Sequence, residues 1–124
     1  MDSTDDLSGC RVLVVEDDAM LSMLLQDLLT EMGCVIAGSA SRFEDASHKC
    51  GALEFDVALL DINLRGERTL SIAETMLERH QPFILATGYG VTMLPESLRA
   101  APMLQKPYRK QDLECALWDA LHNG

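Results

Sequence analysis

The chain has 124 residues, of which 48% are hydrophobic and 24% are charged, values typical of one soluble globular domain. Ten basic residues against twenty acidic ones give a net charge of −10, which disfavours binding to nucleic acid or to an anionic membrane surface. No run approaches the ~18 apolar residues of a membrane span, and the acidic segment 1–9 does not resemble a signal peptide. We therefore expect a cytoplasmic protein with a flexible N-terminus over residues 1–9 and one domain over residues 10–124.

The four cysteines are widely separated and form no Cys-x-x-Cys pair. They are Cys10, Cys34, Cys50 and Cys115. With three scattered histidines, they do not predict a zinc site. Two disulfides are conceivable, but buried thiols in a reducing compartment fit the apolar surroundings of these cysteines better.

The chain begins with a strand pattern, a helix pattern and a second strand pattern. Val12 to Val15 is a short apolar run typical of a strand buried on both faces of a parallel sheet. The next segment predicts a helix that is capped by Asp18 and ends at Gly33. Its buried stripe would comprise Leu21, Leu25, Leu28 and Met32. Cys34 to Ala37 then predicts the second buried strand.

The middle of the chain repeats this alternation. Ser41 and Glu44 form a capping-box pattern, which predicts a second helix. Its buried face would carry Phe43, Ala46 and Cys50. Val57 to Leu60 predicts a third strand, and a third helix is expected over residues 67–80. That helix would bury Leu70, Ala73 and Leu77.

The last third of the chain predicts two more strands and two helices. Phe83 to Ala86 and Met103 to Gln105 have the apolar character of strands. Glycine and proline residues between them leave only a short helix around Glu96 to Ala100. The final helix, over Lys110 to His122, aligns Leu113, Leu117, Ala120 and Leu121.

Five strands alternating with about five helices predict an α/β fold with a doubly wound, five-stranded parallel sheet. We expect the flavodoxin-like three-layer sandwich with strand order 2-1-3-4-5, in which ligands bind at the carboxyl ends of the strands. Polar residues follow every predicted strand except the second, which this order places at an edge. They are Glu16, Asp17 and Asp18 after the first strand, Asp61 after the third, Thr87 after the fourth and Lys106 after the fifth.

The three carboxylates of Glu16, Asp17 and Asp61 would repel one another in a shared pocket, so they need compensating cations. Lys106 offsets one charge, and a ligand set made only of oxygen atoms favours Mg²⁺ for the rest. We expect Asp17 and Asp61 to be carboxylate ligands and Glu16 to act directly or through water. The backbone carbonyl of Asn63 is a further candidate ligand.

The same residues are suited to phosphoryl transfer, which needs an in-line nucleophile and groups that compensate charge on the phosphoryl oxygens. Asp61 is the candidate nucleophile and would form an acyl phosphate. Lys106, the Thr87 hydroxyl and the metal would each hold a phosphoryl oxygen. Gly88 would leave room for the phosphodonor and for water.

These motifs together resemble the bacterial response-regulator receiver domain over nearly all of the chain after Gly9. The resemblance rests on Val14-Val15-Glu16-Asp17-Asp18, Leu60-Asp61, Thr87-Gly88 and Lys106-Pro107-Tyr108. It implies a two-component or phosphorelay protein that is phosphorylated on Asp61 with Mg²⁺. The donor would be a phosphohistidine of a histidine kinase or histidine phosphotransfer protein. The resemblance implies an unidentified output protein and a monomer or phosphorylation-dependent dimer.

Two residues depart from the common receiver pattern. Met103 stands where most receivers have an aromatic residue, and Arg65 stands where proline is common. With Pro82-Phe83-Ile84-Leu85-Ala86-Thr87-Gly88-Tyr89-Gly90, these features resemble the stand-alone receiver subgroup nicknamed FAT GUY. Leu85 replaces the second phenylalanine of that subgroup's motif. Members of the subgroup act in stress-signalling networks without an attached output domain.

Because Met103 cannot provide the usual aromatic coupling, we expect switching to run through the loop from Thr87 to Gly90 and through the fourth predicted helix, around Glu96 to Ala100. The predicted switch and partner surface comprises Gly88, Tyr89, Gly90, Met103, Pro107, Tyr108 and Trp118. Tyr89 has two open interpretations, as a core residue or as a shield of the phosphoryl group. Trp118 is either a partly covered surface residue or a partner contact.

Other functions remain as alternatives to an output-passing switch. The chain could be a phosphate sink or a binding module that regulates a kinase. A phosphohydrolase with an aspartate nucleophile is disfavoured, because such enzymes commonly present Asp-x-Asp with the second carboxylate as general acid. Here the triplet is Asp61-Ile62-Asn63, and an amide cannot donate that proton. We therefore expect no catalysis beyond the chain's own phosphorylation and slow autodephosphorylation.

Overall fold

The computed structural model describes residues 7–88, 94–106 and 108–123. Five parallel strands form one sheet in the order β2-β1-β3-β6-β7, which confirms the predicted order 2-1-3-4-5. The strands are β1 (Arg11–Val15), β2 (Val35–Ala40), β3 (Val57–Asp61), β6 (Phe83–Thr87) and β7 (Met103–Gln105).

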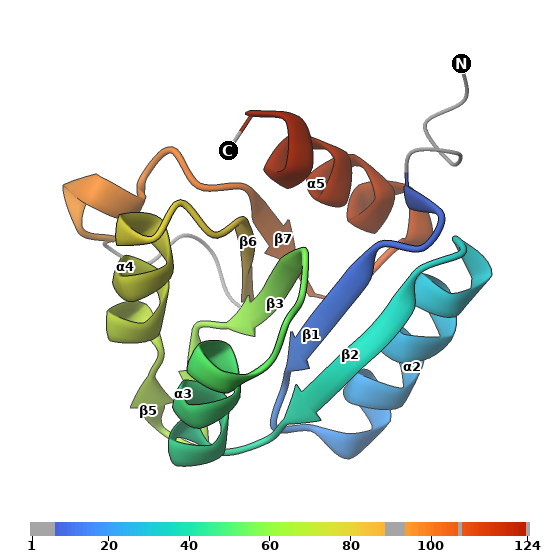
Figure 1. Ribbon diagram of the computed structural model, residues 1–124. Coiled ribbons are helices and arrows are strands. Elements are labelled where there is room, and N and C mark those ends of the chain that lie inside the picture. The colour runs from blue at the N-terminus through green and yellow to red at the C-terminus, as the bar shows by residue number, and fades with distance from the viewer. Residues whose placement is uncertain (1–6, 89–93, 107, 124) are drawn as a thin grey trace.

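Helices cover both faces of this sheet, as expected for a doubly wound three-layer fold (Figure 1). One layer contains α2 (Ala19–Glu31) and α5 (Lys110–Asn123). The other contains α3 (Phe43–Ala52), α4 (Leu70–Glu78) and one 3-10 turn, η1 (Glu96–Leu98). The short helix expected over Glu96 to Ala100 is therefore only this turn.

Side chains of the central strands alternate between two hydrophobic clusters, one under each helical layer. In β1, Val12 and Val14 join the cluster beneath α2 and α5, whereas Leu13 and Val15 join the cluster beneath α3 and α4. Every residue of β3 is buried. This burial on both faces explains why the sequence of β3 is continuously apolar until Asp61.

The second strand differs from the prediction of burial on both faces. β2 lies at an edge of the sheet, and most of its residues are exposed or half-buried. Val35 is 52% exposed. The predicted segment, Cys34 to Ala37, is as apolar as a central strand and does not reveal the edge position, whereas the less apolar Gly38 and Ser39 lie outside it.

The predicted start and end of α2 are confirmed, but the predicted capping box of α3 is wrong. The Asp18 carboxylate accepts hydrogen bonds from the N–H groups of Met20 and Leu21, and Gly33 follows the helix at a φ of +89°. At α3 the N-cap is Arg42, whose side chain makes no capping hydrogen bond. The predicted face of α3 does pack on the core: Ala46 is fully buried, and Phe43 and Cys50 are half-buried against the same cluster.

The third helix is shorter than predicted, because part of its expected range forms a hairpin. β4 (Asn63–Leu64) pairs antiparallel with β5 (Glu67–Arg68), and α4 starts only at Leu70. The predicted stripe is also partly wrong. Leu77 is 42% exposed, and the buried residues of α4 are Ile72, Ala73 and Met76.

Packing begins before the predicted domain boundary at Cys10. Leu7 is fully buried, and the Gly9 N–H donates to the Gly33 carbonyl over 2.8 Å. All four cysteines are free thiols; Cys10 and Cys34 are buried, but Cys115 on α5 is exposed, contrary to the prediction. Within the described ranges, no helix is both long enough and apolar enough to cross a bilayer.

Candidate functional site

The predicted polar residues converge at the carboxyl end of the sheet, where β1, β3, β6 and β7 are neighbours. Glu16 follows β1, Asp61 ends β3 and Lys106 follows β7. Thr87 ends β6, and its carbonyl accepts a hydrogen bond from the Lys106 N–H over 2.9 Å. The parallel register therefore brings residues from distant parts of the sequence into one site.

Lys106 joins two of the carboxylates. Its Nζ lies 2.8 Å from Asp61 Oδ2 and 3.0 Å from Glu16 Oε1. Burial acts to lower the pKa of this ammonium, but its hydrogen bonds to Asp61 and Glu16 outweigh that effect and raise the pKa. Lys106 is therefore a fixed positive charge between two acidic side chains.

Glu16 is buried, and its carboxylate accepts hydrogen bonds from several groups. The Tyr108 hydroxyl donates to Oε1 over 2.9 Å, and the Asp18 N–H donates to Oε2 over 3.0 Å. Burial raises the pKa of Glu16, although the hydrogen bonds from Asp18, Lys106 and Tyr108 act to lower it. The ionised form of Glu16 is therefore incompletely compensated when no cation is bound.

Asp17 is more open and has a different environment. Its Oδ2 accepts a hydrogen bond of 2.8 Å from the N–H of Arg65, at the tip of the β4–β5 hairpin. Burial acts to raise the pKa of Asp17, but the hydrogen bond from the Arg65 N–H and the charge of Lys106 outweigh it and lower the pKa below its ordinary value. Neighbouring carboxylates thus have pKa values shifted in opposite directions.

Residues in the loop after Asp61 fix the position of this residue. The Asn63 N–H donates to Asp61 Oδ1 over 3.1 Å, and the Thr69 hydroxyl donates to the Asp61 carbonyl over 2.8 Å. Asp61 is only 4% exposed. The nucleophile candidate is thus fixed by contacts on both its side chain and its backbone.

The donor set fits a small hard cation. One carboxylate oxygen each from Glu16, Asp17 and Asp61 lies within 4.8 Å of the others. Among the residues that the structure describes, these three acidic groups share the ammonium of Lys106, which leaves negative charge that a divalent ion would offset. Oxygen atoms alone favour Mg²⁺ over softer metals. The carbonyl of Asn63 as a further ligand stays a prediction.

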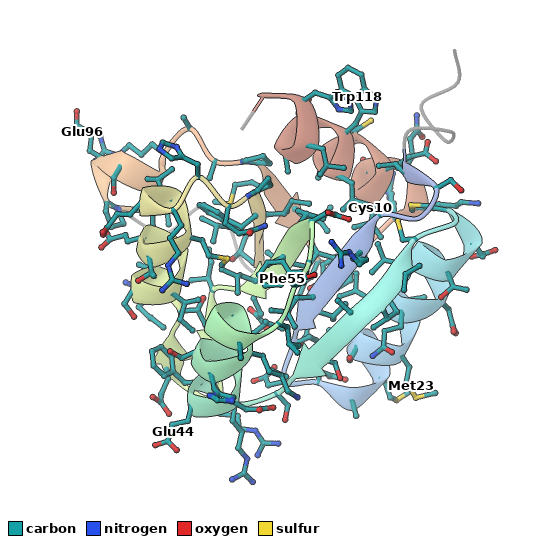
Figure 2. All side chains as sticks on the ribbon, viewed as in Figure 1. Cys10, Met23, Glu44, Phe55, Glu96 and Trp118 are labelled. Atoms are coloured by element: carbon teal, nitrogen blue, oxygen red, sulfur yellow. The ribbon has the colours of Figure 1, made fainter. Side chains whose placement is uncertain are left out.

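The predicted switch and partner residues are only partly brought to this site. Gly88 lies beside Lys106, since a side-chain carbon at position 88 would come 3.7 Å from Lys106 Cδ. Met103 is half-buried against the cluster beneath α3 and α4. Trp118 lies on the outside of α5, away from the sheet, where it stacks on His122 (Figure 2). Tyr89, Gly90 and Pro107 lie outside the described residues.

The assignment of Tyr108 to a surface was wrong. Its side chain is buried, and it donates to Glu16 inside the acidic site. The sequence reasoning also missed Thr69, whose buried hydroxyl supports Asp61, and the Arg65 N–H on Asp17. The position of Tyr108, two residues after Lys106, was an available signal. The residue type at position 65 does not show that its backbone N–H donates a hydrogen bond to Asp17.

Comparisons with known proteins agree with this geometry. A family model described as the response regulator receiver domain matches residues 12–117. The chemotaxis protein CheY of Thermotoga maritima is 38% identical over 106 residues, covering 82% of this chain and 88% of that protein. The transcriptional regulatory protein MalR of Bacillus subtilis is 29% identical over 115 residues and 88% of this chain, but the chain spans only 49% of MalR.

The solution structure of SdrG from Sphingomonas melonis Fr1 is also similar. It matches with a TM-score of 0.79 and 31% identity over 98% of both chains. The family model covers most of the chain, and its range includes the acidic residues, Asp61, Thr87 and Lys106. The chain therefore belongs to the response regulator receiver domain family.

Proposed function

We propose that this chain is a signalling switch that accepts a phosphoryl group on Asp61 with Mg²⁺ as cofactor. The donor is a phosphohistidine of a sensor histidine kinase or a histidine phosphotransfer protein. The observation that carries the proposal is the position of the Asp61 carboxylate. It contacts Lys106 over 2.8 Å and shares a cluster with Glu16 and Asp17.

The transfer step follows from the groups around Asp61. A carboxylate oxygen of Asp61 attacks the phosphorus atom, the P–N bond to the donor breaks, and its electron pair leaves with the imidazole. Lys106 Nζ is close enough to exchange its contact with Asp61 for a phosphoryl oxygen. The Thr87 hydroxyl, at the end of the neighbouring strand, would hold a second oxygen.

Bound Mg²⁺ supplies charge compensation for the phosphoryl oxygens. Asp17 and Asp61 would hold it through carboxylate oxygens. Both oxygens of Glu16 already accept hydrogen bonds, from Tyr108 and from the Asp18 N–H, which favours a role for Glu16 through water. Asn63 remains a proposed carbonyl ligand.

Phosphorylation would then alter binding to an output protein. We propose that the chain acts on a separate output protein, as the stand-alone receivers of the FAT GUY subgroup do. We place this activity in the cytoplasm, in a monomer or a phosphorylation-dependent dimer. A groove lined by Met103, Cys115 and Asp119, between β7 and α5, is a surface at which an output protein can detect phosphorylation.

A phosphate sink or a kinase-regulating module would use the same chemistry and differ only in its partner. A phosphohydrolase finds less support. The Asn63 side chain stands where the general acid would be, and its Oδ1 accepts from the Gly66 N–H over 3.0 Å. We therefore propose that the chain turns over no separate substrate as an enzyme.

Acetyl phosphate with Mg²⁺ tests the assignment of Asp61. Intact-mass spectrometry should show one added phosphate on the wild-type chain and none on Asp61→Asn. Asp27→Asn is a matched control, because Asp27 is an exposed carboxylate on α2, and it should label like wild type. Equal labelling of wild type and Asp61→Asn would refute the proposal, and steady hydrolysis of a phosphomonoester would favour the hydrolase.

A further inference from the structure

We propose that the backbone N–H of Arg65 is a positioning group that orients the Asp17 carboxylate for the cation. The β4–β5 hairpin holds that N–H in place. The inference rests on the proposed function, because Asp17 is a metal ligand only in that function. In this inference a backbone N–H, and not a charged side chain, orients the Asp17 carboxylate.

The contact joins two parts of the chain that are distant in sequence. Arg65 N lies 2.8 Å from Asp17 Oδ2, although 48 positions separate the two residues. It is the hydrogen bond by which the hairpin tip reaches the acidic cluster. Since one carboxylate oxygen of Asp17 is held in this way, the orientation of the whole carboxylate is restricted before a cation arrives.

The hairpin is built to present this N–H. Arg65 and Gly66 connect β4 to β5, and both have positive φ, of 49° and 89°. Positive φ at both central residues is the requirement of a type I′ hairpin turn. The Asn63 side chain accepts from the Gly66 N–H over 3.0 Å, and Leu64 is buried in the core beneath α3 and α4. A hydrogen bond within the turn therefore closes it, and the buried Leu64 side chain attaches it to the core.

The departure of Arg65 from the common receiver pattern has a physical meaning in this setting. Proline, the residue common at this position, has no N–H and fixes φ near about −65°. It can neither donate to Asp17 nor adopt the φ of 49° found at Arg65. A receiver with proline here must orient the equivalent acidic group by other means. The Arg65 side chain is exposed, so its guanidinium is not required for the contact.

Three substitutions at position 65 separate the backbone contact from the side chain. Arg65→Pro removes the N–H and should weaken Mg²⁺ binding about tenfold, the lower range for loss of a group that supports a metal ligand. Arg65→Gly keeps the N–H, accepts positive φ without strain and should retain the wild-type affinity. Arg65→Ala keeps the N–H and should bind Mg²⁺ nearly as well as wild type.

The affinities are measured by titrating Mg²⁺ alone into the phosphate-free chain and following amide NMR signals. Wild-type affinity in Arg65→Pro would overturn the proposal. Equal weakening in Arg65→Ala and Arg65→Pro would also overturn it, because the side chain would then be responsible. A wild-type chain that binds no Mg²⁺ would refute the metal site of the proposed function itself, so the two failures are distinguishable.

Hydrogen exchange tests the contact without any metal. In the wild-type chain the Arg65 amide should be protected, and Asp17→Ala should remove that protection. The Thr69 amide, which donates to the Ile62 carbonyl over 2.9 Å in the same loop, should stay protected in both chains and reports that the loop is intact. An Arg65 amide that exchanges equally in wild type and Asp17→Ala would contradict the assignment.

Discussion

At its amino end the parallel sheet carries ion pairs on the surface, between Arg11 and the carboxylates of Glu54 and Asp56, whereas at its carboxyl end the ion pairs are largely buried. Leu7, Cys10 and Cys34 are buried near the amino end, in the hydrophobic cluster beneath α2 and α5. At the carboxyl end Glu16 and Asp61 meet Lys106. Burying like charges at the carboxyl end costs free energy, and the strands fix the distances between these charges. Stability and chemistry should therefore respond to substitutions at different ends.

The largest effect is expected from Lys106→Met at the carboxyl end. The substitution removes the ammonium that contacts Asp61 and Glu16, while methionine retains much of the apolar stem. The rate of phosphorylation by acetyl phosphate should fall by about 10²–10³, as for loss of one preorganised group that stabilises transition-state charge.

Lys49→Met provides the matched control for this rate measurement. Lys49 pairs with Asp45 on the surface of α3, and its loss should leave the phosphorylation rate unchanged. A normal rate in Lys106→Met would show that convergence at the carboxyl end has no catalytic consequence.

At the amino end, Leu7→Ala should lower the free energy of unfolding by about 2–5 kcal/mol, because Leu7 is fully buried. The Mg²⁺ affinity of the folded chain should not change. Denaturant unfolding and a Mg²⁺ titration measure the two quantities. Leu24→Ala is the control, since Leu24 is 41% exposed on α2 and its truncation should cost well under 1 kcal/mol. Reduced Mg²⁺ affinity in Leu7→Ala would show that packing at the amino end and metal binding at the carboxyl end are not independent.

Glu16→Gln should weaken Mg²⁺ binding and make the stability of the metal-free chain less dependent on pH. Burial raises the pKa of Glu16 in the folded chain above its ordinary 4.5. The stability that Glu16 contributes is therefore present below pH 4.5 and lost as the pH rises through the raised pKa. Thermal unfolding across pH without metal should show this decline in wild type and a smaller one in Glu16→Gln. An equal decline in both chains would contradict the assignment.

The smallest expected effect concerns the relative reaction rates of the four cysteine thiols. Cys115 is exposed and should react first with an aromatic disulfide reagent at neutral pH. Cys50 should follow more slowly, since burial raises its pKa to about 11. Cys10 and Cys34 should react only after unfolding in guanidinium. Peptide mass mapping at successive times gives the order, and early modification of Cys10 would show that the amino end opens readily.

Much of this arrangement was predictable, because few folds explain a series of unbroken apolar runs of which all but the second are followed by a chemically reactive polar residue. Val57 to Leu60 can be buried on both faces only near the middle of a sheet, and this places Asp61 at its carboxyl end. The pairing of Asp61 with Lys106 then follows from parallel strand geometry. The edge position of β2 also followed from the predicted strand order, but the apolar segment Cys34 to Ala37 did not by itself reveal its exposure.

The remaining prediction errors arise where the local sequence is compatible with two different structures. Glu67 and Arg68 are good helix formers, so the helical pattern extended over them, while Gly66 was the only local signal of the hairpin turn. In α4, both Met76 and Leu77 are apolar, and periodicity alone could not decide which one faces the core. The inward position of Tyr108 depends on tertiary packing against Glu16.

The edge strand β7 has only three residues, Met103–Gln105, and proline residues stand close on both sides, at positions 102 and 107. So short an edge has few backbone groups with which another chain could extend the sheet. Aggregation by strand addition is therefore disfavoured along this edge. Recognition there must use side-chain shape and charge, which allows the surface to change specificity through single substitutions without exposing the sheet.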